Sequence, residues 1–241
     1  MRSAQTLVGP KHPIHEPGGE QASMSGWQEI QAFRKRHGSY QAAVTGLARF
    51  LNRFVSFELC MLGLSSGKPH DFETSDRYPA RQVTEGDLFH QSLHPELQGV
   101  DFQFAFERND ICVANFDGST IVGYVFASRE PTEVIDGVTF FFPSWVFYSY
   151  GSMTAPSLRG QRLARTRWPI NTAARKRVPD CDSRDVFFMN VANAETLRSD
   201  VSDGVPSIRL GYAVWLRFRG KLWIWNSPAG RRNGLGFRHS A

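Results

Sequence analysis

The amino-acid sequence predicts a mixed α/β domain with one central sheet, and three observations lead to this fold class. The run 111–128 consists of two β-rich segments that flank an Asp-Gly turn at 117–118, which predicts a β-hairpin. The run 211–225 predicts a second hairpin, with Arg-Gly-Lys at its turn 219–221. The stretch 185–191 is a short, continuously apolar run, as expected for a strand that is buried on both faces.

The N-terminal part of the chain divides into two segments. Pro, Gly, Gln and Ser are frequent in residues 1–26, which we expect to be a disordered leader, and Met24 is an alternative start to the first Met. Apolar residues follow helical spacing from 27 to 54, with basic residues between them, and a strand is predicted at 56–66. Residues 27–77 are therefore expected to form a helical extension with one strand.

The predicted elements follow one another closely in residues 78–226, which we expect to form the main domain. The segment 80–93 indicates a short strand that turns into a helix, with Thr84 as a good N-cap. Residues 138–154 supply one long strand or two short ones. The last residues, 227–241, are rich in Gly and Arg, and we expect them to form a mobile tail.

Composition limits the class of protein. A 41% apolar fraction with 19 Phe and 6 Trp in 241 residues supports a packed core and excludes wholesale disorder. The net charge of +5 and pI of about 9.3 favour a polyanionic ligand, such as a phosphorylated cofactor, a nucleic acid or an anionic membrane surface. Three widely spaced cysteines without a C-x-x-C pattern indicate a reducing, cytoplasmic compartment. We expect no transmembrane segment and no signal peptide.

The stretch 152–168, SMTAPSLRGQRLARTRW, carries the most specific functional signal, because it passes from a β-rich run through a bend into a helix. The amides at a helix N-terminus are unpaired and carry about half a positive charge, and a glycine lets a phosphate approach them closely. The residues from Arg159 to Ala164 would present these amides, and Arg159 and Arg162 add side-chain charge. Pro169 inside the helix is a local conflict. The turn predicts an anion site.

The surroundings of this turn resemble the acyl-coenzyme A binding segment of the GNAT superfamily of N-acetyltransferase-type acyltransferases. Their pattern there is [Gln/Arg]-x-x-Gly-x-[Gly/Ala], after a hydrophobic strand and a Pro. The sequence has Pro156, Arg159 and Ala164 in register and departs at the middle glycine, which is Arg162. The segments ARQVTEGDL, NDICVANFDGSTIVGYVFAS, FFMNVANAETLRS and LGYAVW resemble further strands of these enzymes, so that the resemblance covers about 78–225.

The resemblance implies a GNAT-like mixed sheet with helices on both faces, in which the fourth and fifth strands splay apart. The pantetheine arm of acyl-coenzyme A would pair with the exposed edge of the fourth strand, and the pyrophosphate would rest on the turn. The residues implied for the cofactor are Ser152, Met153, Thr154, Arg159, Gly160, Gln161, Arg162, Leu163, Ala164 and Asn193. No metal site is expected, because His90 and His94 have no third ligand at a recognisable spacing.

Direct attack of an amine on a thioester needs a neutral amine and a proton for the leaving thiolate. In many GNAT members a Tyr about seven residues beyond the Asn supplies that proton, and the corresponding position in this sequence is Asp200. The candidate catalytic residues are Asp200, Ser199 and Tyr212, with Tyr150 and Tyr148 as further acids and Glu133 and Glu107 as further bases. Water or the ammonium product is an alternative proton source.

Three functional hypotheses follow. The first is an acyltransferase that moves an acetyl or longer acyl group from acyl-coenzyme A to a primary amine; an acyl-carrier-protein donor and a homodimer stay open. The second is a catalytically inactive GNAT-fold binding or regulatory module, favoured by Arg162 and the absent Tyr. The third is a basic protein that binds a membrane or a partner through the segment 27–54. No base-stacking or recognition-helix motif predicts nucleic-acid binding.

Overall fold

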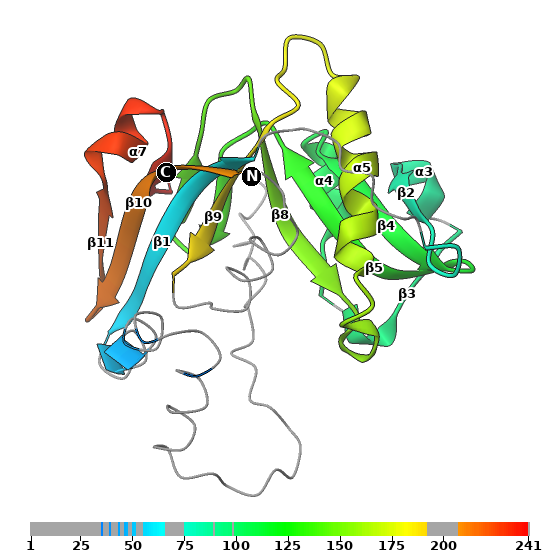
Figure 1. Cartoon of the computed structure of the whole chain (residues 1–241), viewed down its shortest axis with the longest axis horizontal. Helices are drawn as coiled ribbons and strands as arrows, with labels where there is room; N and C mark the ends of the chain where they lie inside the picture. Colours follow the sequence, from blue (N-terminus) through cyan, green and yellow to red (C-terminus); the bar gives the residue numbers. More distant parts are fainter. Residues whose placement is uncertain are drawn as a thin grey trace, which may run out of the picture.

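The computed structural model describes residues 55–65, 75–88, 90–97, 99–191 and 207–240, together with residues 35, 39, 43, 46, 47, 50 and 51. These parts form a mixed α/β structure with a large mixed sheet, a second sheet of three strands and few helices (Figure 1). The predicted leader lies outside the described residues, and so does most of the basic segment 27–54.

The large sheet has nine strands. They are β1 (Ser56–Ser65), β2 (Ala80–Val83), β3 (Ser92–Leu93), β4 (Ile111–Asp117), β5 (Thr120–Ser128), β8 (Phe147–Thr154), β9 (Asp185–Asn190), β10 (Ser207–Phe218) and β11 (Lys221–Asn226). Their order is β11-β10-β1-β9-β8-β5-β4-β2, with β3 beside β5. Only the pairs β8–β9 and β3–β5 are parallel among these strands, so the sheet is mixed.

The second sheet and the helices cover the large sheet. The second sheet has the order β12-β7-β6 and consists of β6 (Thr132–Ile135), β7 (Val138–Phe141) and β12 (Gly236–His239). The described helices are α3 (Glu85–Leu88), α4 (Phe102–Glu107), α5 (Leu163–Lys176) and α7 (Pro228–Arg232), with the short 3-10 helices η1 (Pro95–Leu97) and η2 (Pro156–Leu158).

Both predicted hairpins are confirmed. β4 and β5 pair antiparallel, and Gly118 in their turn has a φ of +59°. β10 and β11 also pair antiparallel, and Arg219 and Gly220 have φ values of +48° and +76°. Positive φ at both central residues is the geometry that suits a two-residue hairpin turn. The β-rich run 138–154 forms two strands, β7 and β8.

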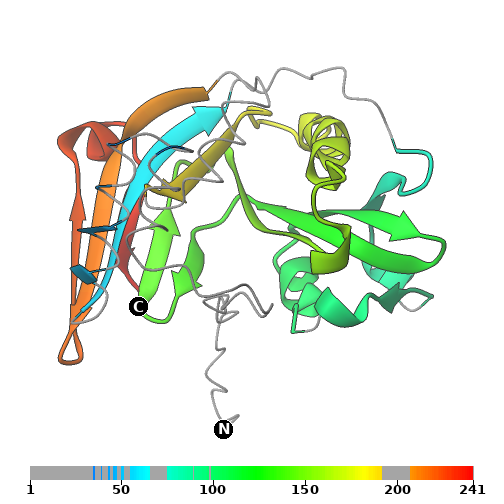
Figure 2. The same cartoon turned by 60° about the horizontal axis from the view of Figure 1, so that its bottom comes forward.

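Helices cover both faces of the part of the sheet formed by β8, β5, β4 and β2, which we call the helix-covered half (Figure 2). The alternation of β4 explains this arrangement. Cys112 and Ala114 pack in one cluster with Phe102 of α4, whereas Val113 packs in another cluster with Ala174 of α5. Helices on both faces, as predicted, are therefore present in this half.

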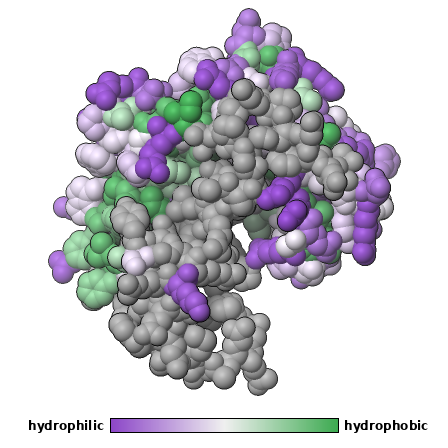
Figure 3. Space-filling view, in the orientation of Figure 1, coloured by the Kyte–Doolittle hydropathy of each residue, from purple (hydrophilic) through white to green (hydrophobic). Residues whose placement is uncertain are grey.

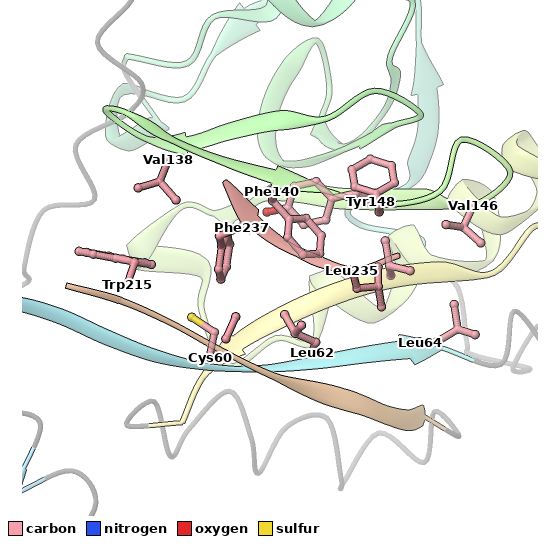
Figure 4. Packing of buried hydrophobic residues seen from close by; sticks show 13 residues of the cluster. Cys60, Leu62, Leu64, Val138, Phe140, Val146, Tyr148, Trp215, Leu235 and Phe237 are labelled. Atoms are coloured by element: carbon pink, nitrogen blue, oxygen red, sulfur yellow. The ribbon is translucent and has the colours of Figure 1, made fainter. Parts of the chain in front are cut away.

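The strands β11, β10, β1 and β9 form the sheet-covered half, because the second sheet packs on one of their faces. Figure 4 shows Phe140 and Phe237 of the second sheet packed toward Cys60 and Leu62 of β1 and toward Trp215 of β10. All five side chains are buried. This cluster is the larger apolar core of the described molecule.

Two parts of this half differ from the sequence-based expectation. β1, expected within an N-terminal extension, lies inside the large sheet between β9 and β10. Residues 228–239, expected to be a mobile tail, form α7 and β12, and both Leu235 and Phe237 are 1% exposed. Asn226 binds the amide and the carbonyl of Phe237 at 2.8 Å each, which joins β12 to the end of β11.

The helix expected after β2 is only one turn long. Thr84 stands directly before it, and the amide and hydroxyl of Thr84 donate to Asp87 Oδ2 at 2.8 and 2.7 Å, which is the carboxylate half of a capping box. No residue of α3 is buried, so tertiary packing does not extend the helix.

Exposed apolar side chains gather on the side of the molecule formed by β10 and β11 (Figure 3). Trp223 and Trp225 of β11 are 48% and 52% exposed. Among the described residues, no helix has the length and apolar character needed to cross a membrane.

Candidate functional site

β8 and β9 separate after two paired positions. These parallel strands pair only at Phe147 with Asp185 and at Tyr148 with Val186. The next amide of β8, that of Ser149, donates to Asp185 Oδ1 at 2.9 Å instead of to the backbone of β9. Beyond this point β9 pairs with β1 on its other side. The separation of two parallel strands that the sequence predicted therefore lies between β8 and β9.

The rest of β8 has one open edge. Beyond Tyr148, β8 pairs with β5 on one side and with no described strand on the other. Between Tyr150 and Met153 the register with β5 shifts by one residue, and Gly151 has a φ of +61°, as in a β-bulge. The Ala155 amide donates to a carbonyl of β5 at 2.9 Å. Because neighbouring residues of a strand point their amides to opposite sides, the Thr154 amide points to the open edge.

The turn of residues 159–162 connects this strand to α5 and presents free amides. Glu96 holds the preceding η2, since its Oε2 accepts from the amide and hydroxyl of Ser157 at 3.0 and 2.7 Å. Gly160 has a φ of +82°, and none of the amides of residues 160–164 donates to a described residue. No side chain caps α5. The turn and the first turn of α5 can therefore receive an anion.

Arg162 stands where the family pattern has glycine, and the structure shows how it fits. Its φ of 59° and ψ of 23° are those of the left-handed region that glycine favours, and its side chain is exposed. This conformation costs a residue other than glycine about 1–2 kcal/mol. The backbone at this position therefore has the shape that a glycine would give it, with the bulky side chain pointing to solvent.

α5 turns a polar face toward the sheet. Its buried polar residues are Thr166, Arg167, Asn171, Thr172 and Arg175. Arg175 Nη1 lies 3.2 Å from Asp185 Oδ1, and burial raises the pKa of Asp185 while this guanidinium opposes the rise. Arg167 has no ion-pair partner among the described residues, and its Nη1 donates to Asn115 Oδ1 at 2.9 Å. On α5, the buried polar atoms without a hydrogen-bond partner among the described residues are Arg167 Nε, Trp168 Nε1, Asn171 Oδ1, and Nε and Nη1 of Arg175.

A second polar group lies on the face of the sheet that α4 covers. The Tyr150 hydroxyl donates to Asp110 Oδ2 at 2.6 Å, and Arg108 Nε lies 3.6 Å from the same oxygen. Burial raises the pKa of Asp110, against the hydrogen bonds and the charge of Arg108. Burial and the adjacent carboxylate also raise the pKa of Tyr150. A carboxyl with a raised pKa is a better proton acceptor than an ordinary Asp, and Tyr150 connects it to β8.

The structure brings most of the predicted cofactor residues together. Ser152, Met153 and Thr154 lie on the open part of β8, and the turn and start of α5 contain Arg159, Gly160, Gln161, Arg162, Leu163 and Ala164. Asn193, Ser199 and Asp200 lie outside the described residues. The candidate site therefore follows one continuous segment, from 149 to 164.

The other catalytic candidates lie elsewhere. Tyr212 is on β10, with β1 and β9 between it and β8, and its hydroxyl accepts from Arg209 at 2.9 Å. Tyr148 is buried in the core between the two sheets. Glu133 accepts from the Gly137 amide, and Glu107 accepts from its neighbour one helical turn earlier. Among the predicted acids that the structure describes, only Tyr150 lies on the open part of β8 next to a polar partner.

Three residues of this site were missed by the sequence analysis: Asp110, Arg167 and Asp185. Asp110 and Asp185 each stand directly before or at the start of an apolar strand, a place where a charge is unexpected if the strand is buried. A charged residue next to an apolar strand was the signal in the sequence that could have identified Asp110 and Asp185. Arg167 is one of several basic residues in a helix, and nothing in the sequence separates it from the exposed ones.

The histidines form no metal site in the described part of the chain, where no group of three or more His, Cys, Asp or Glu side chains gathers. His94 Nδ1 instead accepts a hydrogen bond from the amide of Glu96 at 3.3 Å.

Comparison with known proteins finds a distant structural similarity to two solved structures. No protein-family model and no curated protein matches the sequence. A structure from Novosphingobium aromaticivorans DSM 12444, described as a "Putative Acetyltransferase from the GNAT family", is 14% identical, with 72% of this chain and 67% of that chain covered and a TM-score of 0.41. A "functionally unknown conserved protein" from Staphylococcus epidermidis ATCC 12228 is 9% identical, with 70% and 65% covered and a TM-score of 0.42. The chain thus spans about two thirds of each structure.

Proposed function

We propose that the protein is a GNAT-type acyltransferase that moves an acyl group from acyl-coenzyme A to a primary amine. One observation carries the proposal: the open edge of β8 leads directly into the free amides at the start of α5. A free strand edge can pair with an extended arm, and a helix N-terminus beside a glycine can bind a phosphate. Acyl-coenzyme A contains both groups in one molecule.

The residues have distinct roles in this proposal. Ser152, Met153 and Thr154 would hold the pantetheine arm along β8, and the segment 159–164 would hold the pyrophosphate. The conformation of Arg162 supports this assignment, because its backbone has the glycine-like shape that the family pattern calls for at that position. The exposed side chains of Arg159 and Arg162 add positive charge beside the free amides.

Tyr150 and Asp110 are the described residues best suited to proton transfer. In the proposed reaction the amine nitrogen attacks the thioester carbonyl carbon, the C–N bond forms, the C–S bond breaks, and its electron pair stays on the sulfur. The surplus proton of the nitrogen passes to the Tyr150 oxygen while the Tyr150 proton moves to Asp110 across their 2.6 Å hydrogen bond. The acceptor amine itself is unspecified.

The first test is calorimetric titration of the full chain with coenzyme A and acetyl-coenzyme A. The variant Gly160→Asp places a negative charge against the pyrophosphate, and we expect it to abolish binding. Gly160→Ala is the matched control: it has the same positive-φ cost, and a Cβ at this position meets nothing within 4 Å. Micromolar binding to the wild type and to Gly160→Ala, but not to Gly160→Asp, supports the anion site.

Absence of binding to either ligand would contradict coenzyme A as the carrier of the acyl group and leave a phosphopantetheine-bearing carrier protein as the donor to try. Binding without release of free thiol in the presence of primary amines would favour the alternative, a catalytically inactive binding module. The release of thiol is read with a thiol-specific dye, with acetyl and longer acyl donors.

A further inference from the structure

Arg167 is a buried cation that has no acidic partner in the part of the chain that the structure describes. Its side chain is 1% exposed, and its guanidinium contacts only neutral groups of the described residues: Asn115 Oδ1 at 2.9 Å, and Thr154 Oγ1 and Ser152 Oγ at 3.4 Å. Arg175, two turns further along α5, has Asp185 at 3.2 Å. Burial without compensation is unfavourable for a charge, and it lowers the pKa of Arg167 to about 10.

The fold holds this cation toward the open edge of β8. Arg167 lies between α5 and the sheet, over Gly123 of β5, where any side chain would collide with its Nη1. From there Nη2 reaches Ser152 and Thr154. Ser152 is exposed on the part of β8 that pairs with no other described strand. The positive charge thus lies directly behind the strand edge that would hold the donor arm.

We propose that Arg167 stabilises the thiolate that leaves the acyl donor, in part through the Ser152 hydroxyl. This inference rests on the proposed function. When the amine forms its bond to the carbonyl carbon, the C–S electron pair stays on sulfur as a negative charge, which then takes a proton from water. A fixed cation in a region of low dielectric lowers the free energy of that charge.

The proposed role of Arg167 also concerns the Tyr that protonates the leaving thiolate in many GNAT enzymes. The chain has Asp200 there and not Tyr. A thiolate that is stabilised by a buried cation can leave without being protonated in the same step. The proposal therefore explains how the reaction proceeds without that Tyr.

The test measures the pKa of the thiol of bound coenzyme A, from the ultraviolet absorbance of the thiolate during a pH titration of the full chain. We expect the wild type to lower this pKa by about one unit or more relative to free coenzyme A. Arg167→Gln should return it to the free value or above. Arg159→Gln is the control for charge at the turn, since it should weaken binding of coenzyme A without changing the pKa of the bound thiol.

A second variant keeps the test valid if Arg167→Gln does not fold. Asn115→Asp places a carboxylate at the position that now accepts from Arg167 Nη1, so it neutralises the cation without removing it. We expect the thiol pKa to return to the free value in this variant as well. Circular dichroism checks that each variant is folded.

The outcomes separate this inference from the proposed function. Failure of the wild type to bind coenzyme A contradicts both. If coenzyme A binds but its thiol keeps the pKa of the free molecule, the inference is overturned while the proposed function stands. The same holds if the pKa is lowered equally in the wild type and in a folded Arg167→Gln or Asn115→Asp.

Discussion

The two halves of the large sheet differ in what fills their interior. In the sheet-covered half, the second sheet packs on β1, β9 and β10 through apolar side chains such as Phe140, Phe237 and Trp215. In the helix-covered half, α5 presents buried polar side chains, Arg167 and Arg175 among them. Apolar burial stabilises without directional requirements, whereas each buried polar group needs a partner and costs free energy where it has none.

The difference indicates how the molecule divides stability and function. The sheet-covered half contains the larger apolar core and joins the N-terminal strand β1 to the C-terminal strand β12. The helix-covered half contains the open edge of β8, the free amides of α5 and, on the same helix, four buried polar atoms with neither a hydrogen-bond nor an ion-pair partner among the described residues. Strained or unsatisfied groups concentrate at functional sites, which is where our proposals locate the reaction.

The largest expected effect is loss of the apolar core. Phe237→Ala should lower the free energy of unfolding by about 3–5 kcal/mol, because it empties a site between the two sheets. The neighbouring Arg238→Ala changes an exposed side chain of the same strand and should change stability by less than about 0.5 kcal/mol. Chemical denaturation measures both. Equal stability of the two variants would mean that residues 236–239 are a loose tail after all.

Breaking the buried ion pair between Arg175 and Asp185 should lower the free energy of unfolding by a similar amount in the helix-covered half. Arg175→Met leaves Asp185 as an uncompensated buried carboxylate and should cost about 3–5 kcal/mol of unfolding free energy. The double variant Arg175→Met/Asp185→Asn should recover a large part of this loss, since the amide oxygen of Asn can still accept from Ser149. A double variant no more stable than the single one would show that packing of Arg175, and not its charge, is what matters.

A smaller effect, of opposite sign, is expected at the turn. Arg162→Gly removes the left-handed strain of about 1–2 kcal/mol but adds conformational freedom to the unfolded chain, so we expect a net gain in stability below about 1 kcal/mol. Affinity for coenzyme A should fall only modestly, because the backbone shape is unchanged and only the side-chain charge that Arg162 adds beside the amides is lost. A large loss of affinity, measured by calorimetry, would assign the Arg162 side chain itself to the ligand.

The smallest expected effect is a pH dependence from Asp110. Its pKa is raised in the folded chain, so the folded state binds this proton more tightly than the unfolded state does. Stability contributed by Asp110 is therefore present at low pH and is lost as pH rises from the ordinary Asp value toward the raised one. Relative to Asp110→Asn, the wild type should lose stability over this range in denaturation curves. A difference that grows with pH in favour of the wild type contradicts the raised pKa.

Local patterns in the sequence were enough for the hairpins, the strand at 185–190 and the turn at 159–162 that leads into a helix. The turn residues of both hairpins and the alternation of apolar residues act over a few positions, so their effect is visible without the fold. The helix after the turn was predicted too, and it runs through Pro169. The motif from Arg159 to Ala164 likewise indicated a site because its chemistry depends on consecutive amides.

Only the tertiary structure decided where distant segments meet. β1 could pair with any strand edge, and its place between β9 and β10 depends on apolar contacts with residues more than a hundred positions away. The C-terminal strand is held in the same way, through Leu235 and Phe237 in a core that the rest of the chain provides. A short strand with Gly and Arg around it has no local signal for such burial.

The candidate site likewise has one part that depends on local sequence and one part that depends on contacts between distant segments. The sequence by itself determined the turn and its basic charge, because these lie in one segment. It could not determine that Arg167 would be buried without a carboxylate among the described residues, or that Tyr150 would bind Asp110. Nor could it determine that Asp185 would accept from Ser149, whose amide is the first one after the pairing of β8 with β9 ends. Burial and pairing of charges depend on which side chains the completed fold brings within a few ångströms, and that is settled only by long-range packing.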